Sequence, residues 1–466
     1  MQSPLRIVNL LWAAPFCFCA FSARCDAAAD DKKSVRCTIE AEEVVTRYTP
    51  ADNGAGPLWC YGSTVIARRG SDVYLSVVET GEGVPPLCNT RWQLWHRAPE
   101  GWRIEQSEKQ YRQREPCPIA LFQDGAVFLS VNPLTERTDD NRGRCEPQVL
   151  EFNPSGLGSE PKVRAPAWAE GTDFTEHSYR GFAADGAAGE LLLLNINSET
   201  SDQFVSYRDR KGQWHARGKI TFPIRACYPQ VALRDGSAHV MAIGDIVEPV
   251  DEWKKLKFEK LQREWDYVFR RLFYTYSADI TKGDFSSPVD IDTVESTAGH
   301  IQNLDLYVDA AGAAHLLYLK RPHQYDFIRD KYFPGQAMTA RLEYAVVKKG
   351  DVVSRKTLAR TPGSPGGIEP SFARFHISSA RDLYIVAAGT SIEAGQRRFG
   401  NYLARVPAGQ DEPKFERIGL AHPFHNFFTN TPRGGSAPSD VIDLFGTAED
   451  SPNLRYARIH IEHEGS

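Results

Sequence analysis

The chain has 466 residues, and its 55 Lys and Arg residues against 60 Asp and Glu residues give a formal net charge of −5 at pH 7. This mild acidity gives no electrostatic basis for binding nucleic acid or an anionic membrane surface, so we expect no nucleic-acid partner. The length would accommodate three ordinary domains unless an internal repeat joins the residues into one.

The first 29 residues have the features of a signal peptide. Arg6 supplies a positive charge, residues 7–21 are apolar, and the small residues 27–29 offer a cleavage site. The apolar run is short for a membrane span, and no later run is long and apolar enough, so we expect no membrane span. We therefore predict a mature chain of residues 30–466 that is secreted or periplasmic.

A pair of short apolar runs recurs along the mature chain, each pair reading as the second and third strands of one repeat. The second strands are 72–77, 124–130, 189–195, 235–242, 312–319, 381–387 and 439–445. The third strands are 91–96, 148–153, 204–209, 271–277, 342–347, 401–406 and 454–459. Repeats of short strands separated by turns favour a radial architecture. The sequence predicts an all-β fold, a single seven-bladed β-propeller over residues 30–466.

Two segments fall outside the plain repeat. Residues 35–48 have strand character but no blade, and the seventh blade lacks an outer strand, so we expect them to pair with residues 454–461 and close the ring. Residues 250–269, in the longest loop of blade four, show apolar residues at helical spacing and predict a helical insertion there. That helix either packs on the blade rim or forms a wall over the axial site.

The cysteines suggest two bridges within blades. Three of the nine lie in residues 1–29, which leaves six. Cys60 and Cys88 are 28 residues apart, and so are Cys117 and Cys145, with each pair at the same two places in its blade. The spacing predicts Cys60–Cys88 and Cys117–Cys145 disulfides, which fit an oxidising compartment. The two remaining cysteines, paired with each other or free, are Cys37 and Cys227.

Polar side chains at the starts of the innermost strands are the candidates for chemistry, because those starts surround the propeller axis. The predicted catalytic residues are Tyr228, His300, Glu369 and His425. The predicted substrate-binding residues are Tyr61, His177, Arg180, Arg225 and Asn303. A His or Tyr can act as general acid or base, and an Arg fork binds a carboxylate or sulfate at two points. The set suits an anionic or neutral sugar.

Each of these residues also has a structural alternative. The histidines would then bond neighbouring strands, the tyrosines would pack with a solvated hydroxyl, and Arg180 or Arg225 would pair with a carboxylate such as Glu176 or Asp185. The chain has no CxxC motif and no His-rich tract, and two histidines three apart on a strand, His422 and His425, point to different faces. We predict no metal and no cofactor.

Three hairpins between third and fourth strands resemble the Asp-box of sialidase-like propellers. They read HRAPEGW (96–102), YRDRKGQW (207–214) and SADITKGDFSSP (277–288). The resemblance implies a sialidase-like fold over most of the mature chain. Sialidase chemistry would place three arginines on the substrate carboxylate, and only Arg180 and Arg225 match at strand starts. Secreted propellers of this general kind include polysaccharide lyases with His, Tyr and Arg sites, and the predicted site looks compatible with theirs.

We therefore expect a monomeric carbohydrate-active or glycan-binding propeller that cleaves an anionic polysaccharide as a lyase or a glycoside hydrolase. The alternative is a non-catalytic propeller that serves as a scaffold for protein interaction at the cell surface or in the periplasm. Convergence of the His, Tyr and Arg side chains at the axis would favour the enzyme, because fold alone does not define function.

Overall fold

A computed structural model describes residues 35–59, 62–264, 266–361, 367–393, 395–407, 409 and 412–462. These residues belong to one compact unit, Ser34–Ser466. The predicted signal peptide, Cys60 and Tyr61 lie outside the described residues.

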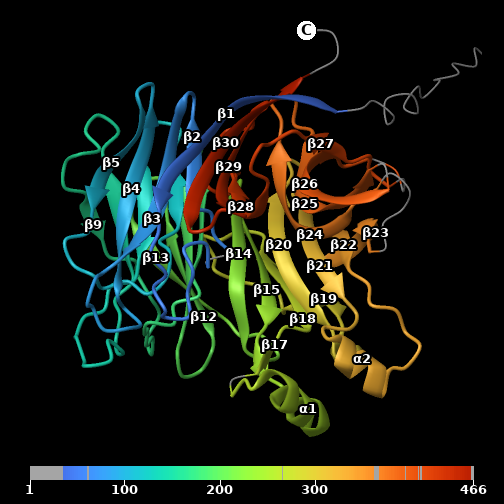
Figure 1. The fold of residues 1–466 in the computed structure, drawn as a ribbon. Helices are drawn as coiled ribbons and strands as arrows, with labels where there is room; N and C mark the ends of the chain where they lie inside the picture. The colour runs from blue at the N-terminus through green and yellow to red at the C-terminus, as the bar shows by residue number, and fades with distance from the viewer. Residues whose placement is uncertain are drawn as a thin grey trace, which may run out of the picture. The chain divides into compact units, whose positions relative to one another are not determined.

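Seven four-stranded antiparallel sheets form the unit, which confirms the predicted all-β, seven-bladed propeller (Figure 1). Blade one consists of β2 (Ile66–Arg69), β3 (Asp72–Thr80), β4 (Thr90–Ala98) and β5 (Gly101–Ser107). Blade two consists of β6 (Ile119–Leu121), β7 (Val127–Val131), β8 (Gln148–Phe152) and β9 (Lys162–Arg164). Blade three consists of β10 (Gly181–Asp185), β11 (Glu190–Ile196), β12 (Gln203–Arg208) and β13 (Trp214–Ile220).

The remaining blades follow the same order from the axis outward. Blade four consists of β14 (Ala226–Arg234), β15 (Ser237–Gly244), β18 (Arg271–Ser277) and β19 (Val289–Thr293), with a small side sheet of β16 (Ile246–Val247) and β17 (Tyr267–Val268). Blade five consists of β20 (His300–Val308), β21 (Ala314–Arg321), β22 (Arg341–Lys348) and β23 (Asp351–Arg360). Blade six consists of β24 (Glu369–Ile377), β25 (Leu383–Glu393), β26 (Gln396–Arg405) and β27 (Glu416–Ile418). Blade seven contains β28 (Phe424–Thr429), β29 (Val441–Ala448) and β30 (Asn453–Glu462).

The two ends of the chain meet in blade seven. Strand β1 (Arg36–Arg47) pairs antiparallel with β30, from Arg36 opposite Glu462 to Arg47 opposite Asn453 (Figure 1). The predicted ring closure is therefore confirmed. The pairing covers the outer edge of β30, which would otherwise present unpaired backbone groups to solvent.

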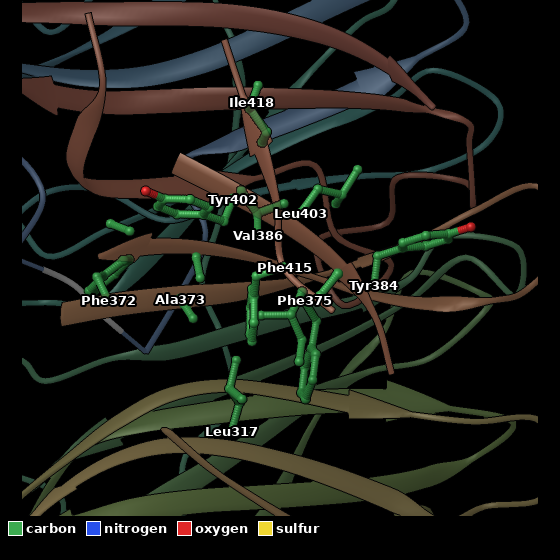
Figure 2. Packing of buried hydrophobic residues seen from close by; sticks show 14 of the residues in the cluster. Leu317, Phe372, Ala373, Phe375, Tyr384, Val386, Tyr402, Leu403, Phe415 and Ile418 are labelled. Carbon is green, nitrogen blue, oxygen red and sulfur yellow. The ribbon is translucent and has the colours of Figure 1, made fainter. Parts of the chain in front are cut away.

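Apolar side chains fill the space between blades. The second strands are the most enclosed, and every residue of β11 is buried, whereas the outer β23 alternates between exposed and partly buried positions. Figure 2 shows one inter-blade cluster, in which Phe375 and Val386 of blade six pack near Leu317 of blade five. Burial of each such large side chain stabilises the fold by roughly 1.5–3 kcal/mol.

A loop from blade seven closes the propeller axis. Arg433 is 4% exposed, its Nε lies 3.1 Å from the Asp305 carboxylate of blade five, and one guanidinium N–H donates to the Gly62 carbonyl at 2.7 Å. Gly435 has a φ of 87°, and a Cβ at that position would lie 1.8 Å from the Leu121 carbonyl oxygen. Only glycine fits there, because the loop runs directly against the backbone of blade two.

Two small helices interrupt the β-structure. Helix α1 (Asp251–Leu261) lies between β15 and β18, and α2 (Asp326–Tyr332) lies between β21 and β22. The helix predicted over residues 250–269 is shorter in the structure, because Gln262 adopts a left-handed conformation and β17 then pairs with β16. A single turn of 3-10 helix spans Glu295–Thr297. Within the described parts of the chain, no helix has the length and apolar character needed to cross a membrane.

Candidate active site

The innermost strands begin at one end of the propeller, which we call the entry face. Both helices are inserted between a second and a third strand, and Figure 1 shows them at this same end. Their apolar sides pack together, with Leu256 of α1 and Ile328 of α2 in one cluster. Loops carried on a rigid scaffold are where binding sites are commonly built, so we looked for converging polar groups on this face.

Four aromatic rings from three blades meet on the entry face. We call Trp59, Tyr179, Tyr228 and Phe269 the aromatic cluster. Tyr228 lies at its centre, with ring centroids 5.7 Å from Trp59, 5.0 Å from Tyr179 and 6.0 Å from Phe269. The rings of Tyr179, Tyr228 and Phe269 are each partly exposed, so the cluster presents aromatic faces and phenol groups to a ligand.

The two tyrosines are held in unusual backbone conformations. Tyr179 has a φ of 27° and Tyr228 a φ of 50°, a region that bulky residues rarely adopt. The pairing of β14 with β15 shifts register between Cys227 and Gln230, so Tyr228 sits in a bulge. The buried Asn303 side chain donates to the Tyr228 carbonyl at 2.8 Å and holds the bulge in place. Strain of this kind, maintained by its surroundings, is typical of functional sites.

Burial raises the pKa values of Tyr179 and Tyr228 above the ordinary range, and nearby anionic groups add to the effect. Both phenols therefore stay protonated at neutral pH and act as hydrogen-bond donors. A protonated phenol beside a scissile bond can supply a proton to a leaving oxygen.

Arg225 lies beside this cluster but already has a carboxylate partner. One guanidinium nitrogen is 2.5 Å from the Asp245 carboxylate, and the guanidinium stacks on Tyr179 at 5.3 Å and on Tyr267 at 5.5 Å. Burial opposes the charge, but Cys227, Asp245 and Tyr179 outweigh it and raise the pKa of Arg225. Arg225 therefore stays positively charged, and its ion pair with Asp245 holds the guanidinium in place.

His177 extends the cluster toward blade two. Its ring stacks on Tyr179 with centroids 6.0 Å apart, and the Arg114 guanidinium contacts both of its ring nitrogens. Partial desolvation and the Arg114 charge lower the pKa of His177 to about 4, although the side chain is exposed at the rim. Arg114 also lines a cavity of about 310 Å³ formed mainly by residues 48–57.

His300 marks the other end of the cluster. It contacts Phe269 with ring centroids 5.7 Å apart, and burial together with Arg321 and Arg270 lowers its pKa to about 4. Its Nδ1 is buried without a hydrogen-bond partner, which leaves Nε2 as the nitrogen open to solvent. His300 is therefore a neutral imidazole with a free proton-accepting position.

Arg321 faces His300 across the first hairpin of blade five. The two residues are register partners at the ends of β20 and β21. The Arg321 side chain makes no hydrogen bond or ion pair with any described residue, and burial lowers its pKa. A half-buried guanidinium without a counter-ion is costly unless an anion binds there. Arg321 is not among the residues predicted from the starts of innermost strands, because it lies at the end of a second strand.

A buried ion network supports the Phe269 segment. The Glu248 carboxylate lies 2.5 Å from Arg270 and 2.7 Å from Lys257 of α1, and Lys257 also reaches Asp266 at 2.6 Å. Burial opposes the charge on Glu248, but Arg270 and Lys257 outweigh it and lower its pKa. The backbone N–H of Ile301 donates to the Phe269 carbonyl at 2.8 Å, so blades four and five are tied together next to His300.

Three predicted site residues lie apart from this group. Arg180 is 1% exposed and donates to the carbonyls of Ser130 and Pro116, because it points opposite to Tyr179 and into the interior. Its expected role in ligand binding is corrected: it joins blades two and three. Among the described residues, Glu369 and His425 make no hydrogen bond, ion pair or ring contact with the aromatic cluster. Glu369 pairs with Arg397, and His425 stacks on Phe399 at 4.3 Å.

The cysteine predictions also need correction. Cys117 is fully buried, burial raises the pKa of its thiol to about 12, and its sulfur contacts Gln113 and the Glu115 carbonyl at 3.9 Å, so it does not pair with Cys145. Cys145 contacts Cys88 instead, across two blades. The Cys60–Cys88 bridge stays a prediction, since Cys60 lies outside the described residues. Cys37, in blade seven, and Cys227, in blade four, are not paired with each other.

The described side chains include no group of three or more His, Cys, Asp or Glu residues placed to hold a metal ion. What converges on the entry face is a different set: two protonated phenols, two neutral imidazoles, one paired arginine and one unpaired arginine. Such a set can bind an anionic group, stack against a sugar ring and move protons.

Comparison with known proteins bears on the fold. The sequence matches no family model and no curated protein. The polysaccharide lyase Uly1 is similar in structure, with a TM-score of 0.51 at 12% identity over 91% of this chain and 99% of that chain. An ulvan lyase of polysaccharide lyase family 25, bound to a GlcA–Rha3S saccharide, has a TM-score of 0.49 at 9% identity over 90% and 95%.

An α-L-arabinanase from Penicillium chrysogenum, complexed with arabinobiose, has a TM-score of 0.41 at 10% identity, over 73% of this chain and 91% of that chain. Identities this low show the fold alone. The chain is a seven-bladed β-propeller whose fold is similar to that of the polysaccharide lyase Uly1, and the Asp-box resemblance to sialidases has no direct support among these neighbours. Its chemistry has to be argued from its own residues.

Proposed function

We propose that this protein is an exported enzyme that cleaves an anionic polysaccharide by β-elimination at the aromatic cluster. The observation that carries the proposal is the pair of His300 and Arg321. A neutral imidazole with a free nitrogen lies beside a desolvated guanidinium that has no counter-ion among the described residues. Placement outside the cytoplasm rests on the predicted signal peptide.

Arg321 binds the carboxylate of a uronic acid residue. Its planar fork matches a carboxylate at two points, and withdrawal of negative charge makes the neighbouring C5 proton more acidic. Binding of the anion also offsets the Arg321 charge next to His300, which favours proton uptake by the imidazole. Substrate binding thus improves the base at the moment it is needed.

His300 and Tyr228 divide the proton transfers. His300 Nε2 accepts the C5 proton, the C5–H electron pair forms a C4–C5 double bond, and the C4–O4 bond breaks. Tyr228, a phenol held protonated by its surroundings, gives its proton to the departing O4, and the proton that His300 took up passes through solvent back to Tyr228 before the next turnover. Phe269 contacts both side chains and offers an apolar surface on which the sugar ring can stack.

The carboxylates around the cluster favour elimination over hydrolysis. Most glycoside hydrolases need two carboxyl groups on either side of the scissile bond. Asp245 is bound to Arg225, Glu115 accepts a hydrogen bond from Ser178 at 2.6 Å, and Glu176 accepts one from the Gly143 backbone N–H at 3.2 Å. The described carboxylates near the cluster therefore have other partners.

A polymeric substrate would extend toward blade one. Arg114 contacts His177 on one side and lines the cavity of about 310 Å³ on the other. A sugar residue next to the cleaved one can lie there, with Arg114 available to an acidic substituent. Extra contacts of this kind to remote sugars raise turnover when they are strongest in the transition state.

The test is a panel of uronic acid polysaccharides assayed by the ultraviolet absorbance of newly formed unsaturated ends. His300→Ala and Tyr228→Phe should each lower kcat by roughly two to four orders of magnitude, the usual contribution of a general base or acid. Arg321→Ala should chiefly raise KM, and Arg321→Lys should restore part of the loss. The matched controls are His460→Ala on β30 and Arg103→Ala on the outer strand β5, whose side chains are 46% and 57% exposed, and both should match the wild type.

Failure of the whole panel, with no binding on a glycan array, would contradict the proposal and support the non-catalytic scaffold. Binding without product release would instead indicate a glycan-binding propeller that has no activity.

A further inference from the structure

Two loops from neighbouring blades interlock on the entry face. Residues 81–89 join β3 to β4 in blade one, and residues 132–147 join β7 to β8 in blade two. The Asn141 side chain of the second loop donates to the Pro85 carbonyl of the first at 2.6 Å. The Asn53 side chain donates to the Leu87 carbonyl at 2.9 Å, so the first loop is held from both sides. The two loops have little freedom to separate.

Each loop places one cysteine at this contact. Cys88 is 1% exposed and Cys145 is 2% exposed, and the two form a closed apolar group with Leu134. The backbone on either side is fixed: the Cys145 N–H donates to the Phe174 carbonyl at 2.8 Å, and Leu134 and Cys145 form a β-bridge. Contact with Cys88 and burial raise the pKa of the Cys145 thiol.

We propose that Cys88 and Cys145, which are free thiols in the structure, form a disulfide that joins blade one to blade two in place of the predicted Cys60–Cys88 bridge. Two thiols in contact on constrained backbones are well placed to reach bridging geometry. The oxidant is a small-molecule disulfide such as oxidised glutathione. The two thiols lose two protons and two electrons as the new S–S bond forms, and one glutathione disulfide becomes two glutathione thiols. The bridge holds whether or not the protein cleaves a polysaccharide.

The bridge braces the part of the entry face next to the aromatic cluster. Residues 108–116 run between the two loops, with Gln113 bonded to Thr90 through backbone N–H and carbonyl groups at 2.9 and 3.0 Å. Arg114, which contacts His177, lies in this segment. A link between the two flanking loops therefore restricts the motion of Arg114. It also joins residues 81–89 and 132–147 into one rigid wall of the entry face.

The experiment is non-reducing peptide mapping of the full mature protein, purified without reductant and equilibrated with oxidised and reduced glutathione. Free thiols are first alkylated, and the protein is then digested. We expect one cross-linked peptide pair containing Cys88 and Cys145, with Cys117 and Cys227 alkylated after denaturation. Alkylation of both Cys88 and Cys145, or a bridge from either one to Cys60 or Cys117, would overturn the proposal.

Thermal melting gives an independent readout. Cross-linking residues 88 and 145 should raise the melting temperature by about 4 °C through the lost entropy of the unfolded chain. Reductant should lower the melting temperature of the wild type by that amount and leave the C88A/C145A variant unaffected. Cys117→Ala is the control: it removes a buried thiol that has no bridge, and its melting temperature should keep the response to reductant. A wild type that melts identically with and without reductant would contradict the bridge.

Discussion

The buried pair of Asp305 and Arg433 should control the stability of the whole ring. Their side chains are 1% and 3% exposed and lie 3.1 Å apart. Asp305 also accepts the backbone N–H of Phe375 at 2.9 Å, so one carboxylate ties blades five, six and seven together. Removal of one partner leaves the other charged and buried, which typically costs about 3–5 kcal/mol.

The expected cost converts directly into a melting temperature. At about 2 cal/mol/K of unfolding entropy per residue, a propeller of this size loses about 1 °C per kcal/mol, so Asp305→Ala should lower the melting temperature by about 3–5 °C. Scanning calorimetry or circular dichroism measures the shift. The control is Lys109→Ala, which breaks the Lys109–Glu160 pair, where the side chains are 85% and 76% exposed. It should leave the melting temperature unchanged.

A double-mutant cycle separates the pair from general packing. Arg433→Met should be about as destabilising as Asp305→Ala, and the double variant should lose much less than the sum, because no unpaired charge remains. Strict additivity, or an Asp305→Ala variant as stable as Lys109→Ala, would refute the interpretation of Asp305 and Arg433 as the closure of the axis.

Three further predictions concern other parts of the molecule. Asn303→Ala removes the donor to the Tyr228 carbonyl and should lower the free energy of unfolding by about 1–3 kcal/mol. On a substrate that the protein cleaves, it should lower kcat more than it raises KM. An unchanged kcat would contradict a role of Asn303 in positioning Tyr228. Burial lowers the pKa values of His239 and His376 from 6.5 to about 4, so the unfolded chain takes up protons at a higher pH than the folded chain does. The unfolding free energy should therefore fall as pH drops from 6.5 to 4. Urea titrations measure this fall, and the contribution of these two histidines should be constant above pH 6.5. Deletion of residues 30–48 removes β1 and should abolish soluble expression, whereas a truncated protein that melts like its parent would contradict ring closure by β1.

The blade architecture was predictable because it repeats. Short apolar strands at regular intervals leave few alternatives to a propeller, and a strand-like segment without a blade has one natural partner, the incomplete blade seven. The helix predicted in blade four is too long, because apolar residues continue at helical spacing past Gln262 although the helical backbone ends there. The pairing of β16 with β17 depends on a contact between segments that no local pattern reveals.

The site was predictable only in part. Two of the residues predicted from the starts of innermost strands, Tyr228 and His300, lie close together in the structure because each contacts Phe269; their catalytic role stays a prediction. Arg180 was wrong because its side chain turns into the interior and donates to the carbonyls of Ser130 and Pro116, whereas its neighbour Tyr179 lies in the aromatic cluster. Arg321 was missed because its position opposite His300 comes from strand register, which one sequence does not show.

The predicted Cys117–Cys145 bridge failed for a related reason. Equal spacing in two blades indicated that each bridge lies within its own blade. In the structure, equivalent loops of adjacent blades contact each other instead, so the repeat brings Cys88 to Cys145. A radial repeat creates contacts between equivalent positions as readily as within one unit.

The central claim, elimination at His300 and Arg321, is tested most directly by the fate of solvent oxygen. A uronic acid polysaccharide that the protein cleaves is digested in oxygen-isotope-labelled water, and the products are analysed by mass spectrometry. We expect products with unsaturated ends and no labelled oxygen at the cleaved bond. His300→Ala and Arg321→Ala should not form these products. Incorporation of labelled oxygen at the new reducing end, or cleavage that survives both substitutions, would contradict it.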